Sequence, residues 1–339
     1  MCPAAGLHPH GQTFPPTGVR LIKYRQLGRS GLRVSAYALG TNAFGGRADE
    51  AASTAVIHHA LDHGVNLIDT ANIYTETRSE TIIGKALKGR RGQAIVATKC
   101  GMRTGEGPND LSSSRWHIMR EVDGSLRRLQ SDYIDLYQIH RFDDRTPVEE
   151  TLRAFDDLIR QGKLRYIGCS NFAAWQLCKA LWASDRYGLT RYESVQPEYS
   201  PANRRIEGEL IPLCLDQGVG VIVWFPLAGG ILTGKYKAGA EAPQGSRAVT
   251  QPAFARRLTE ANLTLARDME RLAAEVGATV AQLTLAWVMN RPGITSAIVG
   301  ATRVAQQEEN LKSVDLELSA EVSGRVDAIS QSFINIPEG

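Results

Sequence analysis

Four polar side chains with complementary chemistry stand at or just after the ends of apolar segments. Asp69 closes the segment VNLID, Tyr74 follows five residues later, Lys99 closes AIVATK and His140 closes YIDLYQIH. A lysine ammonium near a tyrosine favours the phenolate and makes the phenol a better proton donor near neutral pH. An aspartate can hold that ammonium, and a neutral imidazole can donate a hydrogen bond to the oxygen being protonated. These residues could therefore protonate a carbonyl oxygen while hydride reaches its carbon, without a metal.

The alternative for any one of these residues is an ordinary surface role, because charged side chains at strand ends are usually solvated. Their joint placement favours a shared site. Residues two positions apart lie on the same face of a strand, so Asp69, Lys99 and His140 each continue the face of the residues two and four positions earlier. Three consecutive strands are then expected to direct their last side chain the same way.

These residues are positioned by a regular alternation of strand and helix patterns. After a predicted hairpin over 24–35, eight apolar strand segments are each followed by a helical pattern, and another helix is predicted near 319–330. This order predicts an α/β fold, namely a (β/α)8 TIM barrel with an N-terminal β-hairpin and an additional C-terminal helix, whose active site would lie at the C-terminal strand ends. The predicted strands are 36–40, 65–69, 94–99, 133–140, 164–168, 192–196, 220–224 and 295–299, and the predicted helices are 49–63, 79–88, 113–129, 148–161, 173–185, 204–217, 257–290 and 303–313.

An open doubly wound sheet is the alternative fold, but the GxGxxG turn that carries a dinucleotide there does not occur in the sequence. The composition is that of an ordinary globular protein. The 339 residues are 43% hydrophobic and 22% charged with a net charge of +3, which argues against a nucleic-acid-binding or membrane-binding surface. We expect residues 1–20 to form a disordered extension and residues 21–339 to form one barrel domain.

The sequence predicts a cytoplasmic protein without a bound metal. The extension lacks the apolar core of a signal peptide, and no apolar run reaches 18 residues. The five cysteines form no CxxC motif, which indicates neither a disulfide framework nor a zinc site. A metal-dependent hydrolase remains as an alternative, but the HxH pair His8 and His10 lies in the extension, and His58 and His59 lie on a predicted helix.

Hydroxyl, amide and indole side chains follow or end the later predicted strands and suggest a second function. Ser170, Asn171 and Gln196 offer hydroxyl and amide groups that could hold a carboxamide, and the face of Trp224 could stack on its ring, although core packing is the alternative for Trp224. That arrangement is typical of a nicotinamide site. The long loop over 229–256 is rich in glycine and cations, and we expect either phosphate contacts or a solvated surface.

Seven segments in order resemble the aldo-keto reductase superfamily, from about residue 24 to residue 311. Within that superfamily, the stretch 224–236 and the SRA at 246–248 are most similar to the branch containing bacterial reductases and the potassium-channel β subunits. The matching segments are LIDTANIY (67–74), ATKCG (97–101), DYIDLYQIH (132–140), GKLRYIGCSNF (162–172), VQPEYS (195–200), VWFPLAGGILTGKY (223–236) and GATRVAQQEENL (300–311).

The resemblance implies specific site residues and the cofactor NADPH, with NADH as the alternative. The implied catalytic residues are Tyr74 as general acid with Asp69, Lys99 and His140. The implied nicotinamide contacts are Ser170, Asn171, Gln196 and Trp224. The other implied cofactor contacts are Gly40, Thr41, Asn42, Asp69, Phe225, Pro226, Leu227, Gly229, Lys235, Ser246, Arg247, Gly300, Thr302, Gln306, Glu309 and Asn310.

The sequence departs from the family pattern at two positions. Thr75 follows Tyr74 where many relatives have glycine, and Gly300 stands where another branch has a phosphate-binding lysine. The second departure leaves the 2′-phosphate of NADPH to Arg247 and, as a further candidate, Arg303.

The resemblance implies an NADP-dependent oxidoreductase that reduces an aldehyde or ketone reversibly. The alternative is a cofactor-binding, redox-sensing regulatory subunit that acts through a protein partner. The predicted partner of the enzyme is a small-molecule carbonyl or alcohol. Its pocket is expected to be lined, besides Tyr74, by Phe44, Trp116, Arg141 and Phe142.

Overall fold

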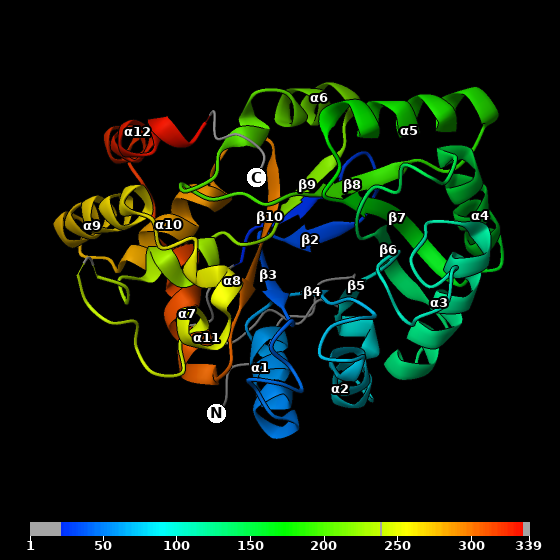
Figure 1. The fold of residues 1–339 in the computed structure, drawn as a ribbon, viewed down its shortest axis with the longest axis horizontal. Helices are drawn as coiled ribbons and strands as arrows, with labels where there is room; N and C mark the ends of the chain where they lie inside the picture. Colours follow the sequence, from blue (N-terminus) through cyan, green and yellow to red (C-terminus); the bar gives the residue numbers. More distant parts are fainter. Residues whose placement is uncertain (1–21, 238, 335–339) are drawn as a thin grey trace, which may run out of the picture.

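The centre of the molecule is a closed barrel of eight parallel strands (Figure 1). The computed structural model describes residues 22–237 and 239–334. The strands neighbour one another in chain order, and the barrel closes where β3 (Tyr37–Gly40) pairs with β10 (Ile294–Gly300). The predicted (β/α)8 barrel is therefore confirmed. The other barrel strands are β4 (Leu67–Asp69), β5 (Ile95–Cys100), β6 (Ile134–Ile139), β7 (Leu164–Ser170), β8 (Tyr192–Gln196) and β9 (Gly220–Val223).

Helices surround this barrel, and each crossover from one strand to the next contains at least one of them (Figure 1). The longer helices are α1 (Glu50–Asp62), α2 (Arg78–Ala86), α3 (Arg115–Leu129), α4 (Val148–Arg160), α5 (Ala174–Tyr187), α6 (Leu210–Gln217), α9 (Glu260–Glu275), α10 (Val280–Met289), α11 (Val304–Leu311) and α12 (Ala320–Ile329). Shorter helices are η1 (Arg91–Gln93), η2 (Arg205–Glu207), η3 (Ala228–Thr233), α7 (Arg247–Thr250), α8 (Pro252–Ala255), η4 (Lys312–Val314) and η5 (Gln331–Phe333).

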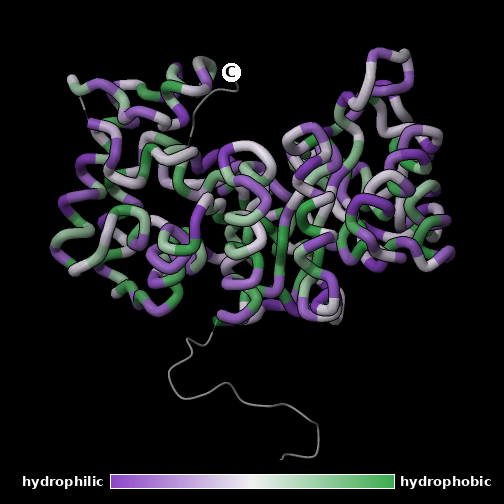
Figure 2. Tube along the Cα trace, turned by 90° about the horizontal axis from the view of Figure 1, so that it is seen from below, coloured by the Kyte–Doolittle hydropathy of each residue, from purple (hydrophilic) through white to green (hydrophobic). Residues whose placement is uncertain are grey.

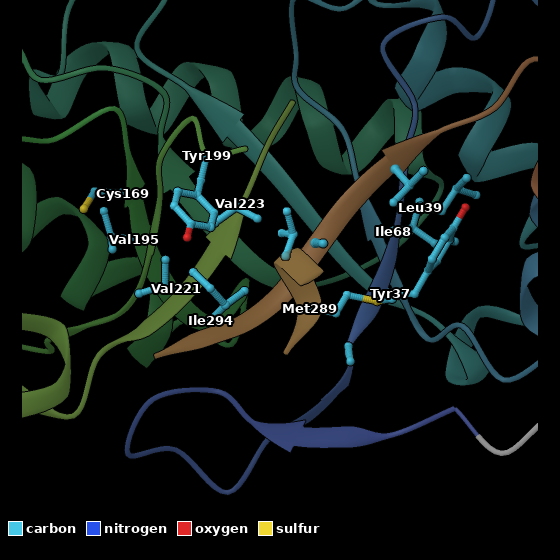
Figure 3. Packing of buried hydrophobic residues seen from close by; sticks show 14 of the residues in the cluster. Tyr37, Leu39, Ile68, Cys169, Val195, Tyr199, Val221, Val223, Met289 and Ile294 are labelled. Carbon is cyan, nitrogen blue, oxygen red and sulfur yellow. The ribbon is translucent and has the colours of Figure 1, made fainter. Parts of the chain in front are cut away.

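The period-2 alternation of the strands divides the core into two layers. On β9, Val221 and Val223 belong to the layer between strands and helices, whereas Ile222 belongs to the small cluster inside the barrel. Figure 3 shows Val221, Val223, Ile294 and Met289 of the outer layer, and Figure 2 shows hydrophobic residues gathered toward the centre. The inner cluster is Leu27, Val34, Ala38, Leu67, Ala97, Leu136, Ile222 and Ile298.

The same alternation decides which polar side chains point into the barrel. Leu67, Ala97 and Leu136 occupy inner positions on β4, β5 and β6. Two residues after Leu67 and Ala97 come Asp69 and Lys99, which therefore share the inner face at the C-terminal end of their strands. Polar side chains thus follow the last inner apolar layer, at the mouth where barrel sites are built.

The opposite end of the barrel is covered by the predicted N-terminal hairpin, which is also confirmed. β1 (Tyr24–Gln26) and β2 (Arg33–Ser35) pair antiparallel, and the fully buried Leu27 and Val34 join the inner cluster. The turn at Gly28 has a φ of 58°, and a Cβ there would lie 2.4 Å from the backbone oxygen of Glu193 on β8. Glycine is therefore needed where the hairpin packs against the start of the barrel strands.

Some predicted boundaries were wrong. The single helix predicted over 257–290 is two helices, α9 and α10, because Gly277 has a φ of 66° and Thr279 caps a new helix by accepting from the N–H of Gln282. The helix predicted over 204–217 starts as η2 and becomes α-helical only at α6. Within 22–237 and 239–334, no single helix is long and apolar enough to cross a membrane; α9 and α10 pass that test only together, with a 91° bend between them.

The predicted disordered extension over 1–20, with His8 and His10, lies outside the described residues.

Candidate active site

A buried ion pair lies at the C-terminal ends of β4 and β5. The Lys99 Nζ atom donates to both carboxylate oxygens of Asp69, at 2.8 and 2.7 Å, and to the backbone oxygen of Thr70 at 2.8 Å. The Lys99 side chain is completely buried. With three acceptors in place, this ammonium satisfies the condition for burying a charge.

The phenol of Tyr74 completes the environment of this ammonium. Lys99 Nζ lies 3.4 Å from Tyr74 Oη, and the imidazole of His140 meets the Tyr74 ring edge-on with the ring centroids 5.9 Å apart. His140 is held because its backbone N–H donates to the oxygen of Cys100 and its backbone oxygen accepts from Asn171. The structure thus brings together the four residues that the sequence singled out.

The pKa values of this group show how burial and charge compete. Burial lowers the pKa of Lys99, but Asp69 and Tyr74 outweigh it and raise the pKa above 10.5, so the ammonium stays charged. Burial raises the pKa of Tyr74 above its usual 10, and Lys99 offsets only part of that rise. The sequence suggested a phenol acidified by lysine; in the free protein the lysine instead limits the rise that burial imposes.

His140 is a neutral imidazole over the ordinary pH range. Burial, together with the positive charges of Lys99 and Arg141, lowers its pKa to about 3. Its buried Nδ1 atom has no hydrogen-bond partner among the described residues. A neutral imidazole can donate one hydrogen bond without adding charge to the cavity.

The loop that carries Tyr74 has an unusual backbone. Thr75, Glu76 and Thr77 all have positive φ angles, between 47° and 74°, a region that costs energy for residues with a Cβ. The Thr75 hydroxyl donates to the backbone oxygen of Phe44 at 2.5 Å and fastens this turn to the loop after β3. The departure from glycine after Tyr74 is thus accommodated by a hydrogen bond that glycine could not make.

On the far side of the barrel, amide groups form a connected network. Asn171 has a left-handed backbone with a φ of 57°, and its side chain donates to Ser170 and accepts from Trp224 Nε1. Gln196 Nε2 donates to Asp69 at 2.7 Å, a contact that sequence spacing does not reveal. The amides are therefore linked to the same carboxylate that holds Lys99.

A cavity of about 780 Å³ opens over these groups at the barrel mouth. The sequence-predicted residues that line it are Gly40, Thr41, Asn42, Asp69, Tyr74, His140, Arg141, Ser170, Asn171, Gln196, Trp224, Phe225, Pro226, Leu227, Gly229, Lys235, Ser246, Arg247, Gly300, Thr302 and Gln306. Residues that the sequence did not single out include Ala43, Arg47, Met102, Thr233, Ile298 and Val299. Several of these follow strands β3 and β5, and the rule that barrel sites are built from such loops is the signal that could have found them.

Five predicted contacts lie elsewhere. Phe44 is fully buried in the outer core, and Phe142 packs edge-on against Phe172 with ring centroids 5.2 Å apart. Trp116 is 55% exposed on α3 and lines a separate surface hollow. Glu309 and Asn310 lie on α11 outside the cavity lining, where the Glu309 backbone and side chain accept from Gln282.

The loop after β9 fits a phosphate group. The hydroxyl of Ser246 is buried without a hydrogen-bond partner among the described residues, and Gly229 and Gly230, both with positive φ angles, line the cavity nearby. Lys235 and Arg247 line the same region. Burial in the first place, and then the positive charges of Arg47 and Arg257, lower the pKa of Arg247 to about 10. An orphaned donor with cations around it suits an anionic ligand.

Metal and thiol chemistry have little support in the described part of the chain. No group of three or more His, Cys, Asp or Glu side chains there could hold a metal ion. Cys100 and Cys169, which flank the site in sequence, are fully buried, and burial raises the pKa of both thiols, that of Cys100 to about 12. Neither thiol is a reactive thiolate.

Comparison with known proteins places this geometry in a family. Residues 37–331 match the model of the Aldo/keto reductase family. The chain is 38% identical over 327 residues to a probable voltage-gated potassium channel subunit beta of Arabidopsis thaliana, covering 94% of this chain and 99% of that protein. It is 39% identical over 312 residues to the uncharacterized oxidoreductase YrpG of Bacillus subtilis, covering 89% and 94%. Identity to the versiconal hemiacetal acetate reductase of Aspergillus parasiticus is 34% over 326 residues, covering 88% and 94%.

Proposed function

The chain belongs to the aldo/keto reductase family, and from that premise we propose that it reduces an aldehyde or ketone reversibly to an alcohol with NADPH. Family membership by itself supports an oxidoreductase that acts on carbonyl compounds. The observation that carries the finer proposal is the position of Tyr74 at the cavity, with the Lys99 ammonium 3.4 Å from its hydroxyl.

In this proposal Tyr74 donates the proton to the carbonyl oxygen. Loss of that proton leaves a phenolate, which the Lys99 ammonium stabilises because opposite charges at this distance attract strongly in a buried site. Asp69 keeps the ammonium oriented toward the phenol. The reverse reaction, alcohol oxidation, uses the same phenolate as the base.

His140 orients the carbonyl in this proposal. Its imidazole stays neutral because its pKa is held at about 3, so it can donate a hydrogen bond to the carbonyl oxygen without competing as an acid. The contact of its ring with that of Tyr74 places both donors on one side of the cavity. In this proposal both groups donate to the same oxygen and so fix the position of the carbonyl.

The amide network and the loop after β9 would hold the cofactor. Ser170, Asn171 and Gln196 would bind the carboxamide, and Trp224 would stack on the nicotinamide. Lys235, Ser246 and Arg247 would bind the phosphates. When bound, the nicotinamide supplies the hydride, while the protein supplies position and electrostatics.

A carbonyl panel assayed by the absorbance of NADPH tests this proposal. We expect consumption of NADPH that depends on both carbonyl and protein, with NADH less effective at equal concentration. Absence of turnover with every aldehyde and ketone of a broad panel, from protein that binds NADPH, would count against the enzyme.

The second candidate is a redox-sensing regulatory subunit that binds the same cofactor and acts through a protein partner. It is favoured by the similarity to the Arabidopsis protein, which is described as a probable channel subunit beta. The complete set of Asp69, Tyr74, Lys99 and His140 favours the enzyme. Cofactor binding without turnover, together with capture of a membrane channel by the purified chain, would favour the subunit.

A further inference from the structure

The charged side chains that line the cavity are nearly all cationic. Among the described residues of the lining, Asp69 is the sole acid, and Lys99 already neutralises it. The cationic lining residues are Arg47, Arg141, Lys235, Arg247 and Arg303. A concave site lined by one sign of charge attracts ligands of the other sign.

These cations lie at two ends of the cavity. Lys235, Arg247 and Arg303 come after β9 and β10, where the cofactor phosphates would lie, and Arg47 is at the same end because its charge acts on Arg247. Arg141 comes from the opposite side, directly after His140, and its charge acts on the His140 imidazole. It therefore stands beside the group proposed to orient the carbonyl, not beside the phosphates.

The backbone around Arg141 is fixed on both sides. His140 is tied to Cys100 and Asn171 by the hydrogen bonds given above, and Phe142 packs edge-on against the rings of Phe172 and Trp175. One residue further on, Asp143 accepts from the backbone N–H of Ser113 at 2.8 Å and from the hydroxyl of Thr146 at 2.7 Å. The backbone that carries Arg141 is thus held by contacts on both sides.

The guanidinium itself has no partner. Throughout 22–237 and 239–334, no residue forms a hydrogen bond or ion pair with the Arg141 side chain. Arg145, in the same loop, differs: it pairs with Asp143, is 70% exposed and does not line the cavity. Arg141 is itself exposed, but it lines the cavity next to His140, where an unpaired arginine is available to a ligand.

We infer that Arg141 binds an anionic group of the substrate, so that the protein prefers aldehydes or ketones that also carry a carboxylate. The inference rests on the proposed carbonyl reduction. A guanidinium matches a carboxylate through two parallel, charge-assisted hydrogen bonds. Because Arg141 and His140 are adjacent in the chain and line the same cavity, the expected substrates carry both a carbonyl and a carboxylate, as oxo acids, semialdehydes and formylbenzoates do.

The test compares 4-carboxybenzaldehyde with 4-formylbenzamide, which share the ring and the aldehyde and differ in charge. We expect kcat/KM with NADPH to be about tenfold or more higher for the carboxylate, mainly through KM, as a charge-assisted hydrogen bond predicts. That ratio should fall as ionic strength rises, because salt screens a partly exposed charge. Arg141→Met should bring the ratio close to one, Arg141→Lys should keep part of it, and the matched control Arg145→Met should keep all of it.

Equal kcat/KM values for the two aldehydes would overturn the inference and leave carbonyl reduction standing. The same holds if Arg141→Met keeps the preference, or if Arg47→Met removes it instead. If neither aldehyde is reduced, carbonyl reduction is in question, and calorimetry with the NADP⁺-loaded protein decides the inference separately. Tighter binding of 4-(hydroxymethyl)benzoate than of 4-(hydroxymethyl)benzamide, lost in Arg141→Met, supports it; equal binding overturns it.

Discussion

At the residue scale, the central feature is a charge that is buried yet fully satisfied. Lys99 is completely enclosed, and Asp69, Thr70 and Tyr74 take up its donors. Asp69 in turn accepts from Gln196, so the proton-donating side and the amide side of the cavity share one carboxylate. A substitution that alters the hydrogen bonds on one side is therefore expected to alter those on the other side through Asp69.

Replacement of Tyr74 by phenylalanine tests the proton donor. Tyr74→Phe keeps the ring that contacts His140 but removes the hydroxyl, so kcat should fall about 10²-fold or more, the usual scale of general acid catalysis. NADPH binding, measured by fluorescence titration, should be nearly unchanged and serves as the control for folding. A folded variant that retains half of the turnover would remove Tyr74 from this role.

His140 makes a pH-dependent contribution to stability. Its folded pKa of about 3 lies below the usual 6.5, because burial and two positive charges disfavour its protonation. Below about pH 6.5 the unfolded chain therefore takes up a proton at this position, whereas the folded protein does not. The free energy of unfolding then falls as the pH drops from about 6.5 toward 3, by at most about 1.4 kcal/mol per pH unit. Urea unfolding at several pH values should show that the free energy of unfolding depends less steeply on pH for His140→Asn than for the wild type. The same pH dependence in both proteins would contradict a lowered pKa for His140.

Site residues at strand ends could be predicted from alternation, and the loop residues Tyr74 and Arg247 were predicted as well, but the directions of other loop side chains could not be. Asp69 and Lys99 are fixed by alternation along β4 and β5, which the sequence displays. Phe44 and Phe142 turn away from the cavity because their loops fold back onto the core, and loop directions have no periodic signature. The contact between Gln196 and Asp69 joins strands on different sides of the barrel, and its geometry depends on the barrel radius.

At the element scale, the strands were predictable because each contains a short apolar run, which is buried throughout in β3 and β9, whereas the helix breaks were not predictable. The split between α9 and α10 falls inside a continuous apolar pattern, and its signals are only Gly277 and the cap formed by Thr279 and Gln282. The short helices α7 and α8 lie within the segment that was expected to be a long loop. Four-residue helices have too little pattern to stand out.

The N-terminal hairpin provides a test at this scale. Gly28→Ala would force a Cβ to within 2.4 Å of the Glu193 backbone oxygen at a residue with positive φ, and it should lower the free energy of unfolding by about 1–3 kcal/mol. Gly31→Ala is the matched control in the same turn, because nothing lies within 4 Å of its added Cβ. Chemical denaturation would measure both. Equal effects of the two substitutions would show that the hairpin does not pack as described.

At the scale of the whole molecule, the cavity is lined by residues from both ends of the barrel sequence. Gly40 ends the first barrel strand and Gly300 ends the last, and a Cβ on Gly40 would meet Ile298 at 2.7 Å. A ligand in this cavity therefore contacts segments that are far apart in the sequence and lie together only in the folded protein. Such a ligand stabilises the folded state, by about 2.7 kcal/mol when its concentration is a hundred times its Kd.

This linkage gives a test of cofactor discrimination. At equal concentrations, NADPH should raise Tm more than NADH does, because Arg247 can meet the 2′-phosphate with a two-pronged hydrogen bond. Arg247→Ala should raise the Kd of NADPH by about one to two decades and leave that of NADH within about threefold. Arg303→Ala is the comparison. If Arg247→Ala weakens the binding of NADPH and NADH equally, Arg247 contacts the pyrophosphate that both cofactors share. If only Arg303→Ala selectively weakens NADPH binding, Arg303 at the start of α11 distinguishes the two cofactors.

Closure of the barrel between β3 and β10 has a consequence for how the chain is made. Tyr37 pairs with Ala297, so one edge of β3 has no partner until synthesis has passed β10. At typical elongation rates of roughly 5–20 residues per second, that edge waits on the order of ten to fifty seconds. Open strand edges are templates for wrong pairing. The nascent chain therefore passes through a period in which crowding by other nascent chains, and protection by chaperones, decide how much of it reaches the closed barrel.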